Sequence, residues 1–122
     1  MRLSVKLAGE TLSGIQDLKE MLLDDENFGD LRITNGFAVD QAFIDVKDFK
    51  NWDAVIIKKI KYQNEKPSSE VRTDLNISEQ TKNQIEQLKK VFPDILGVSY
   101  VTTPYVIRLV IKASLLIRTC QI

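Results

Sequence analysis

The residues available for chemistry are limited, because the chain of 122 residues contains no histidine and one cysteine. Catalysis by an imidazole base, Ser–His–Asp triads and histidine metal sites are therefore excluded. A single cysteine, Cys120, can build neither a zinc–thiolate cluster nor an internal disulfide, which is typical of a reducing compartment. The sequence thus predicts a non-enzymatic, cytoplasmic protein with no catalytic residues, no metal and no cofactor.

Carboxylates are the remaining candidates for metal binding. Four acids follow the first expected helix: Asp24, Asp25, Glu26 and Asp30. A calcium loop that began at Asp25 needs glycine at its sixth position and an acid at its twelfth. Those positions hold Asp30 and Gly36, so the pattern fails. An acidic loop exposed to water is the better interpretation.

Basic residues recur on segments that we expect to be strands, and they form the candidate partner-binding surface. Outward bases on neighbouring strands make a positive sheet face that can contact phosphates or an acidic protein partner. Bases on an exposed sheet edge also oppose aggregation, which is the alternative explanation. The candidates are Lys59, Lys61, Arg72, Arg108, Lys112 and Arg118.

The charges are divided unevenly between the two halves of the sequence. Residues 1–57 carry 6 Lys/Arg and 11 Asp/Glu, a net charge of −5. Residues 58–122 carry 11 Lys/Arg and 6 Asp/Glu, a net charge of +5. We favour the interpretation that the halves lie side by side and attract each other. The alternative is a surface with one acidic and one basic face.

Periodicity predicts the elements of the first half. Alternating apolar side chains indicate a strand over 3–7, and helical spacing from Leu12 to Leu22 indicates a helix. A second strand is expected over 30–34. Asn35–Gly36 is a turn sequence, but the pattern that follows suits a helix over 39–49 better than a hairpin.

Two further strands are predicted over 54–62 and 71–77, joined as an antiparallel hairpin. In this register Tyr62 faces Val71, and their neighbours alternate inward and outward consistently. Tyr62 and Tyr105, the aromatics on the expected strands, point inward, which weakens the case for base stacking on single-stranded nucleic acid.

The last segments are a helix that Ser78 caps and Pro93 ends, a strand from Val98 to Val101, and a strand over 105–117. A helical pattern also fits 105–117, although the period-two alternation is stricter. Arg108 and Lys112 interrupt this apolar region, so it is expected to be protein core and not a membrane span.

The length of 122 residues predicts a single domain over 1–122. Its first and second halves each contain a strand followed by a helix, and these units align at an offset of 70 residues, which suggests a pseudo-repeat of 2–34 and 71–103. Shared packing demands explain the same spacing without duplication. The predicted fold is α+β: a mixed or antiparallel sheet of five to six strands with three helices. Its two βαβ units form a ferredoxin-like core with an inserted helix and strand.

A fold of this kind does not decide function. The missing catalytic groups, small size and charge asymmetry favour a module that docks on a partner protein, as an accessory, regulatory or inhibitor protein. The alternative is a nucleic-acid-binding protein that uses a basic strand face. A hydrolase or transferase that uses only Asp and Glu side chains is the third possibility.

Overall fold

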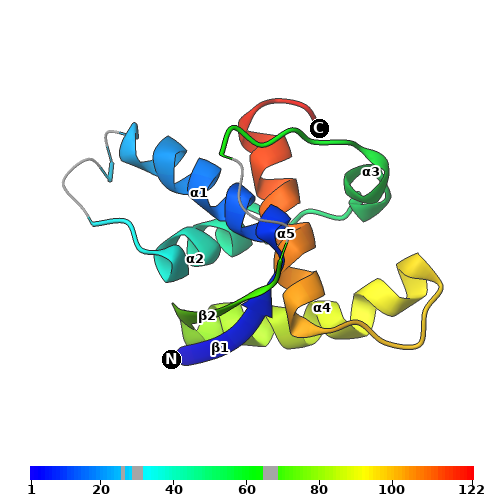
Figure 1. The fold of residues 1–122 in the computed structure, drawn as a ribbon. Helices are drawn as coiled ribbons and strands as arrows, with labels where there is room; N and C mark the ends of the chain where they lie inside the picture. The colour runs from blue at the N-terminus through cyan, green and yellow to red at the C-terminus, as the bar shows by residue number, and fades with distance from the viewer. Residues whose placement is uncertain (26, 29–31, 65–68) are drawn as a thin grey trace.

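A computed structural model describes residues 1–25, 27–28, 32–64 and 69–122 and shows a two-stranded sheet packed against helices (Figure 1). The elements are β1 (Arg2–Leu7), α1 (Gly9–Leu23), α2 (Asn35–Asp45), α3 (Trp52–Ile57), β2 (Val71–Asn76), α4 (Glu79–Leu96) and α5 (Thr103–Arg118). The prediction of five to six strands, three helices and a ferredoxin-like core is therefore wrong. The described residues form two strands and five helices.

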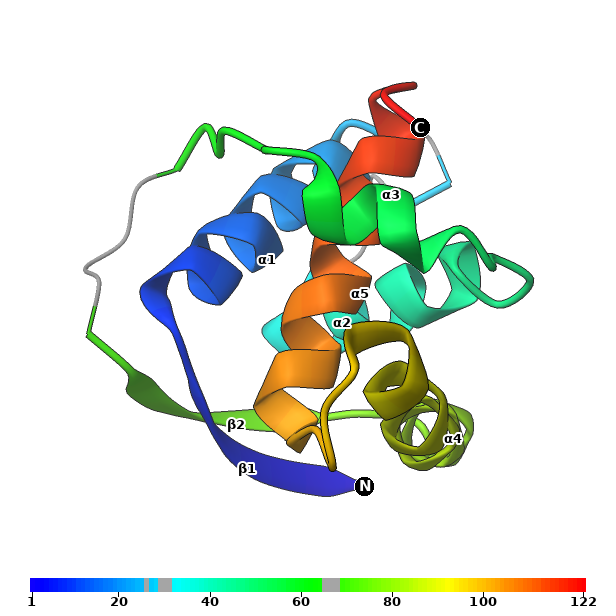
Figure 2. The same cartoon turned by 90° about the vertical axis from the view of Figure 1, so that its right-hand side faces the viewer.

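The two strands, which we call the ribbon, pair antiparallel with Arg2 opposite Asn76 and Leu7 opposite Val71. Val5, Leu7 and Leu75 are buried beneath it, as the alternation of each strand predicts. Figures 1 and 2 show the ribbon at the lower end of the molecule, with the helices on one side of it. Its other face is open among the described residues.

The predicted hairpin between 54–62 and 71–77 is wrong, because β2 pairs with β1 instead. Trp52–Ile57 form the short helix α3, in which Trp52 and Val55 are buried while Ile57 is 79% exposed. Burial at i and i+3 is helical, so residues 54–57 are the end of a helix and not the start of the predicted strand.

The predicted strand over 105–117 is also wrong, and the helical alternative is correct. Pro104 lies in the first turn of α5, where a missing N–H costs nothing. α5 lies at the centre of the fold and contacts α1, α2, α3, α4 and β1 (Figure 2). Because most of its side chains are buried, its polar side is narrow, and the helical pattern in its sequence competes with period-two alternation.

The other three helices are confirmed, with shifted ends. Thr34 caps α2 by accepting a hydrogen bond from the N–H of Phe37. Ser78 caps α4 as predicted, accepting from the N–H of Thr81 at 3.1 Å. α4 does not stop at Pro93 but continues to Leu96 and ends at Gly97, whose φ of 70° is left-handed.

Two more expected strands are missing. Residues 98–101 form no strand and belong to the connection between α4 and α5. Of the strand expected over 30–34, residues 32–34 are not in a strand, and Asp30 and Leu31 lie outside the described residues. No helix in the described part of the chain has the length and apolar character to span a membrane.

Candidate nucleic-acid interface

The outer face of the ribbon gathers polar side chains from both ends of the chain. Every second residue of each strand points outward and is exposed, because its neighbours point into the core. Three of these six residues are basic and one is acidic, a net charge of +2. They are Arg2, Ser4 and Lys6 of β1 and Arg72, Asp74 and Asn76 of β2.

The arginines of this face reach across to the opposite strand. Arg2 Nη2 donates to Asp74 Oδ2 at 2.6 Å, and Arg72 Nη1 donates to Ser4 Oγ at 3.2 Å. Hydrogen bonds from Arg2 and then Ser4 lower the pKa of Asp74 below its ordinary value. The carboxylate is therefore ionised at neutral pH and fixes the Arg2 guanidinium over the ribbon.

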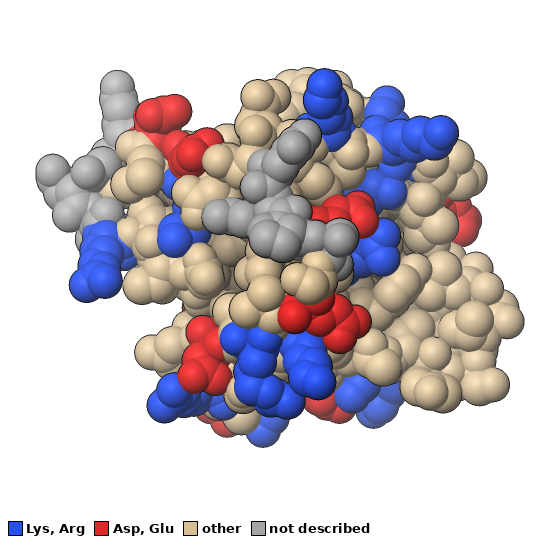
Figure 3. Space-filling view, viewed as in Figure 1, with Lys and Arg blue, Asp and Glu red and all other residues tan. Residues whose placement is uncertain are grey.

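The other end of the ribbon face carries two like charges directly opposite each other. Lys6 lies directly opposite Arg72 in the strand register. No ion pair joins either base to an acid among the described residues. Like charges in directly opposed positions are mildly destabilising, and an anion between them removes the repulsion. Figure 3 shows basic side chains at the lower end of this view, where the ribbon lies, with acidic side chains among them.

A polar hollow of about 550 Å³ lies beside the ribbon, where the first turn of α2 meets the end of β2. Its lining includes Asp74 and Asn76 of the ribbon and two further bases, Lys19 and Arg32. Lys19 Nζ donates to Asn35 Oδ1 at 3.1 Å, which holds its ammonium group near the start of α2. The same lining includes the acids Asp40 and Asp74, so the two bases and two acids of this flank balance in charge.

The structure separates the six bases that sequence analysis grouped together. Arg72 lies on the ribbon, but Lys59 and Lys61 are exposed on the connection between α3 and β2. Figure 1 shows the first part of this connection at the opposite end of the molecule from the ribbon. The predicted continuous basic face is therefore not formed.

Arg108 and Lys112 share one side of α5 and face α1, not a strand neighbour. Arg108 Nη2 donates to Glu10 Oε2 of α1 at 2.8 Å. Partial burial lowers the pKa of Lys112 below its ordinary value, an effect that the nearby Glu10 opposes. The ion pair of Arg108 joins the two halves of the chain, in line with the interpretation that the acidic and basic halves attract each other.

Arg118 forms a second such contact, with an acid of α2. Its Nε and Nη2 donate to the two carboxylate oxygens of Asp45 at 2.6 and 3.1 Å. Ser114 Oγ donates to the same carboxylate at 2.6 Å. The side chains of Arg118 and Asp45 are 24% and 17% exposed, so this partly buried group joins α5 to the end of α2.

Reversal of the charge at Arg118 should therefore destabilise the fold. Arg118→Glu places a second carboxylate beside Asp45 and removes two charge-assisted hydrogen bonds, at a cost of about 1.5–3 kcal/mol. The matched control is Arg108→Glu, whose ion pair with Glu10 is 45% and 42% exposed. This exposed pair is expected to contribute at most about 1 kcal/mol. Urea unfolding followed by the fluorescence of Trp52 measures both; equal losses would contradict the assignment.

Sequence analysis missed five of the six outward ribbon residues as a site. The alternation within each strand was visible in the sequence: it places Ser4 and Lys6 on one side of β1, and Asp74 and Asn76 on one side of β2. What was missing was the pairing of β1 with β2, which brings these two sets onto one surface.

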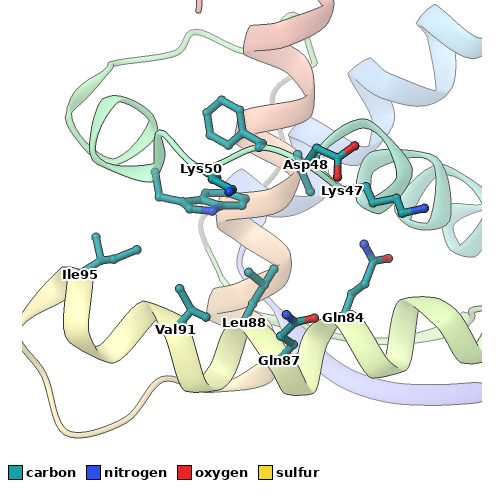
Figure 4. A pocket seen from close by; sticks show the side chains of 11 residues that line it. Lys47, Asp48, Lys50, Gln84, Gln87, Leu88, Val91 and Ile95 are labelled. Atoms are coloured by element: carbon teal, nitrogen blue, oxygen red, sulfur yellow. The ribbon is translucent and has the colours of Figure 1, made fainter.

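A second hollow, of about 310 Å³, lies between α4 and the segment that joins α2 to α3 (Figure 4). Leu88, Val91 and Ile95 of α4 form its apolar side, and Trp52 lies opposite. Polar side chains surround this apolar surface; they are Lys47, Asp48, Lys50, Gln84 and Gln87. The hollow holds no group of acids suited to catalysis, and none of the described residues cluster as metal ligands.

Comparison of the chain with known family models, curated proteins and solved structures finds no match.

Proposed function

We propose that this chain binds double-stranded DNA, without enzymatic activity, by placing the outer face of the ribbon in the major groove. One observation carries the proposal. Lys6 and Arg72 oppose each other on a sheet face that no helix of the described residues covers, and neither base forms an ion pair with a described acid. An arrangement that costs stability in the isolated protein gains free energy when a polyanion lies against it.

The dimensions and the side chains both suit a DNA groove. Neighbouring strands lie about 4.8 Å apart, and the major groove of B-form DNA, about 12 Å wide, admits a two-stranded ribbon. Arginine and lysine pair with guanine, asparagine with adenine, aspartate with cytosine, and serine with several bases. All of these side-chain types stand on the ribbon face.

Other nucleic acids fit less well. The major groove of A-form RNA is too narrow and deep for such a reader. Binding of single strands normally uses aromatic side chains on which bases stack, and none of the six outward ribbon residues is aromatic. Duplex DNA is therefore the substrate class that the ribbon favours.

The flank of the ribbon supports this geometry. A ribbon inserted in the groove brings the start of α2 toward the neighbouring phosphates. Lys19 and Arg32 line the hollow at that point, together with the carboxylates Asp40 and Asp74. Backbone N–H groups at a helix start and basic side chains are the usual partners of phosphate oxygens, and these contacts position a protein on the duplex.

A titration of labelled random-sequence duplex DNA tests the proposal. Binding should be detectable at low salt, and affinity should fall as salt rises, because each phosphate contact releases counterions. Lys6→Ala combined with Arg72→Ala should weaken binding at least about tenfold and reduce the salt dependence. The protein should remain folded, because both side chains are exposed.

The matched control is Lys59→Ala combined with Lys61→Ala, which removes the same charge at exposed positions away from the ribbon. We expect this variant to retain most of its affinity. Equal losses in the two variants would show attraction by net charge without a role for the ribbon. Absence of duplex binding at low salt would reject the proposal altogether.

Docking on a partner protein is the second candidate. Its support is the hollow between α4 and the α2–α3 segment, where Val91 is 41% exposed beside Leu88 and Ile95. The bases first assigned to docking give it less support, because Arg108 and Arg118 bind acids of this chain. A pull-down from cell lysate with and without nuclease separates the two functions, since only protein docking survives removal of nucleic acid.

A further inference from the structure

Resting on the proposed function, we infer that one copy of this chain reads a short DNA duplex whose sequence is not a palindrome. The inference follows from the ribbon, whose two strands come from one chain and carry different outward side chains. A homodimer presents two identical strands, so its binding sites mirror its two-fold symmetry. The two strands of this ribbon are arranged like the two strands of a homodimer, but their outward side chains differ.

The equivalent positions of the two strands follow from the register. Ser4 lies opposite Asp74, and a two-fold axis through this central pair exchanges residue n of β1 with residue n + 70 of β2. The helices that follow the strands obey the same relation, since α1 starts at Gly9 and α4 at Glu79. α2 packs against β2 as α5 packs against β1. Common ancestry of the halves stays a prediction; the geometry needs only their placement.

One outward position is the same in both strands. The axis exchanges Arg2 with Arg72, and each arginine donates a hydrogen bond to the central residue of the opposite strand. Both halves of the ribbon therefore present a guanidinium in a related position. In a groove, these arginines supply the contacts that the two halves of the site have in common.

The central position differs between the strands. Asp74 holds Arg2 in an ion pair at 2.6 Å, whereas Ser4 holds Arg72 by a neutral hydroxyl at 3.2 Å. A carboxylate only accepts hydrogen bonds and suits the amino group of cytosine, but a hydroxyl both donates and accepts. The two arginines therefore stand in unlike electrostatic surroundings, and the central base pairs meet unlike partners.

The third position differs most in its base preference. The axis exchanges Lys6 with Asn76. Lysine has donors only and suits the two acceptors of guanine, whereas the asparagine amide pairs with the donor and acceptor of adenine. One end of the site is thus expected to favour guanine and the other adenine, by tenfold or more at each position. A palindrome satisfies only one of these ends.

Selection from a random duplex library with the purified chain tests this inference. We expect the wild-type protein to enrich a non-palindromic site and to bind it as one chain per duplex, measured by titration above the dissociation constant. Two symmetrised variants supply the decisive comparison. Asp74→Ser with Asn76→Lys gives β2 the outward residues of β1, and Ser4→Asp with Lys6→Asn does the reverse. All four positions are exposed, and thermal melting verifies that both variants fold.

Each symmetrised variant should enrich a palindrome. The site that the wild-type protein enriches should consist of one half-site from each of the two palindromes. The two variants change the net charge in opposite directions, so a general charge effect cannot produce both results. A palindromic wild-type site bound by two chains would overturn the inference and leave DNA binding standing. Enrichment of the unchanged wild-type site by both variants would also overturn it. If the wild-type protein enriches no duplex and binds none at low salt, the proposed function falls with it.

Discussion

Substitution of Gly36 by alanine should destabilise the protein by about 1–3 kcal/mol, with a lower urea midpoint. Gly36 is in the first turn of α2, where the helix passes the end of β2. A β-carbon at this position would lie 2.2 Å from the carbonyl oxygen of Asn76 and 2.8 Å from its backbone nitrogen. Both atoms belong to the backbone, so α2 and the ribbon must separate, and overpacking of this kind typically costs that amount.

The sign of the effect is the test. Without a steric conflict, a change from glycine to alanine inside a helix stabilises by about 0.5–1 kcal/mol. A rise in stability for Gly36→Ala would therefore contradict the close approach of α2 to β2. Because the same contact places Lys19 and Arg32 beside the ribbon, this variant should also bind duplex DNA more weakly.

Truncation of Ile111 to alanine should cost about 2–5 kcal/mol, which is a large part of the stability of a small domain. Ile111 is fully buried in α5, the helix that touches every layer of the fold. Its Cγ2 atom lies 2.7 Å from where a β-carbon on Gly14 of α1 would stand, so α1 and α5 are in close contact here. A cavity at this point has little room to collapse.

Ile117→Ala is the matched control, since it removes the same atoms from the same helix at a half-buried position. It should cost clearly less than Ile111→Ala. Thermal unfolding can follow Trp52, which is buried against Phe49 and Phe92 with ring centroids 5.1 and 4.8 Å away. Equal losses for the two variants would mean that α5 is not enclosed as the structure has it.

Parts of the candidate site were present in the sequence from the start. Each strand of the ribbon shows period-two alternation, and Ser4, Lys6, Arg72, Asp74 and Asn76 were correctly expected to point outward. The partner of β2 was predicted wrongly, because a strand's alternation fixes which face is buried and not which strand lies beside it. The nearer segment 54–62 offered a consistent register, whereas the true partner β1 lies at the other end of the sequence.

By itself, then, the sequence determined local features: the helices α1 and α4, the Ser78 cap, the two faces of each strand, and the absence of imidazole chemistry. These depend on neighbouring residues and on residue types. Tertiary structure alone decided that β1 pairs with β2 and that the segment of α5 is a helix and not a strand. α5 is enclosed by other elements and needs apolar residues on nearly all sides, which matches a strand pattern as well as a helical one. Only packing decides between a strand and a helix for this segment. Packing also decides the pairing of the ribbon that carries the site.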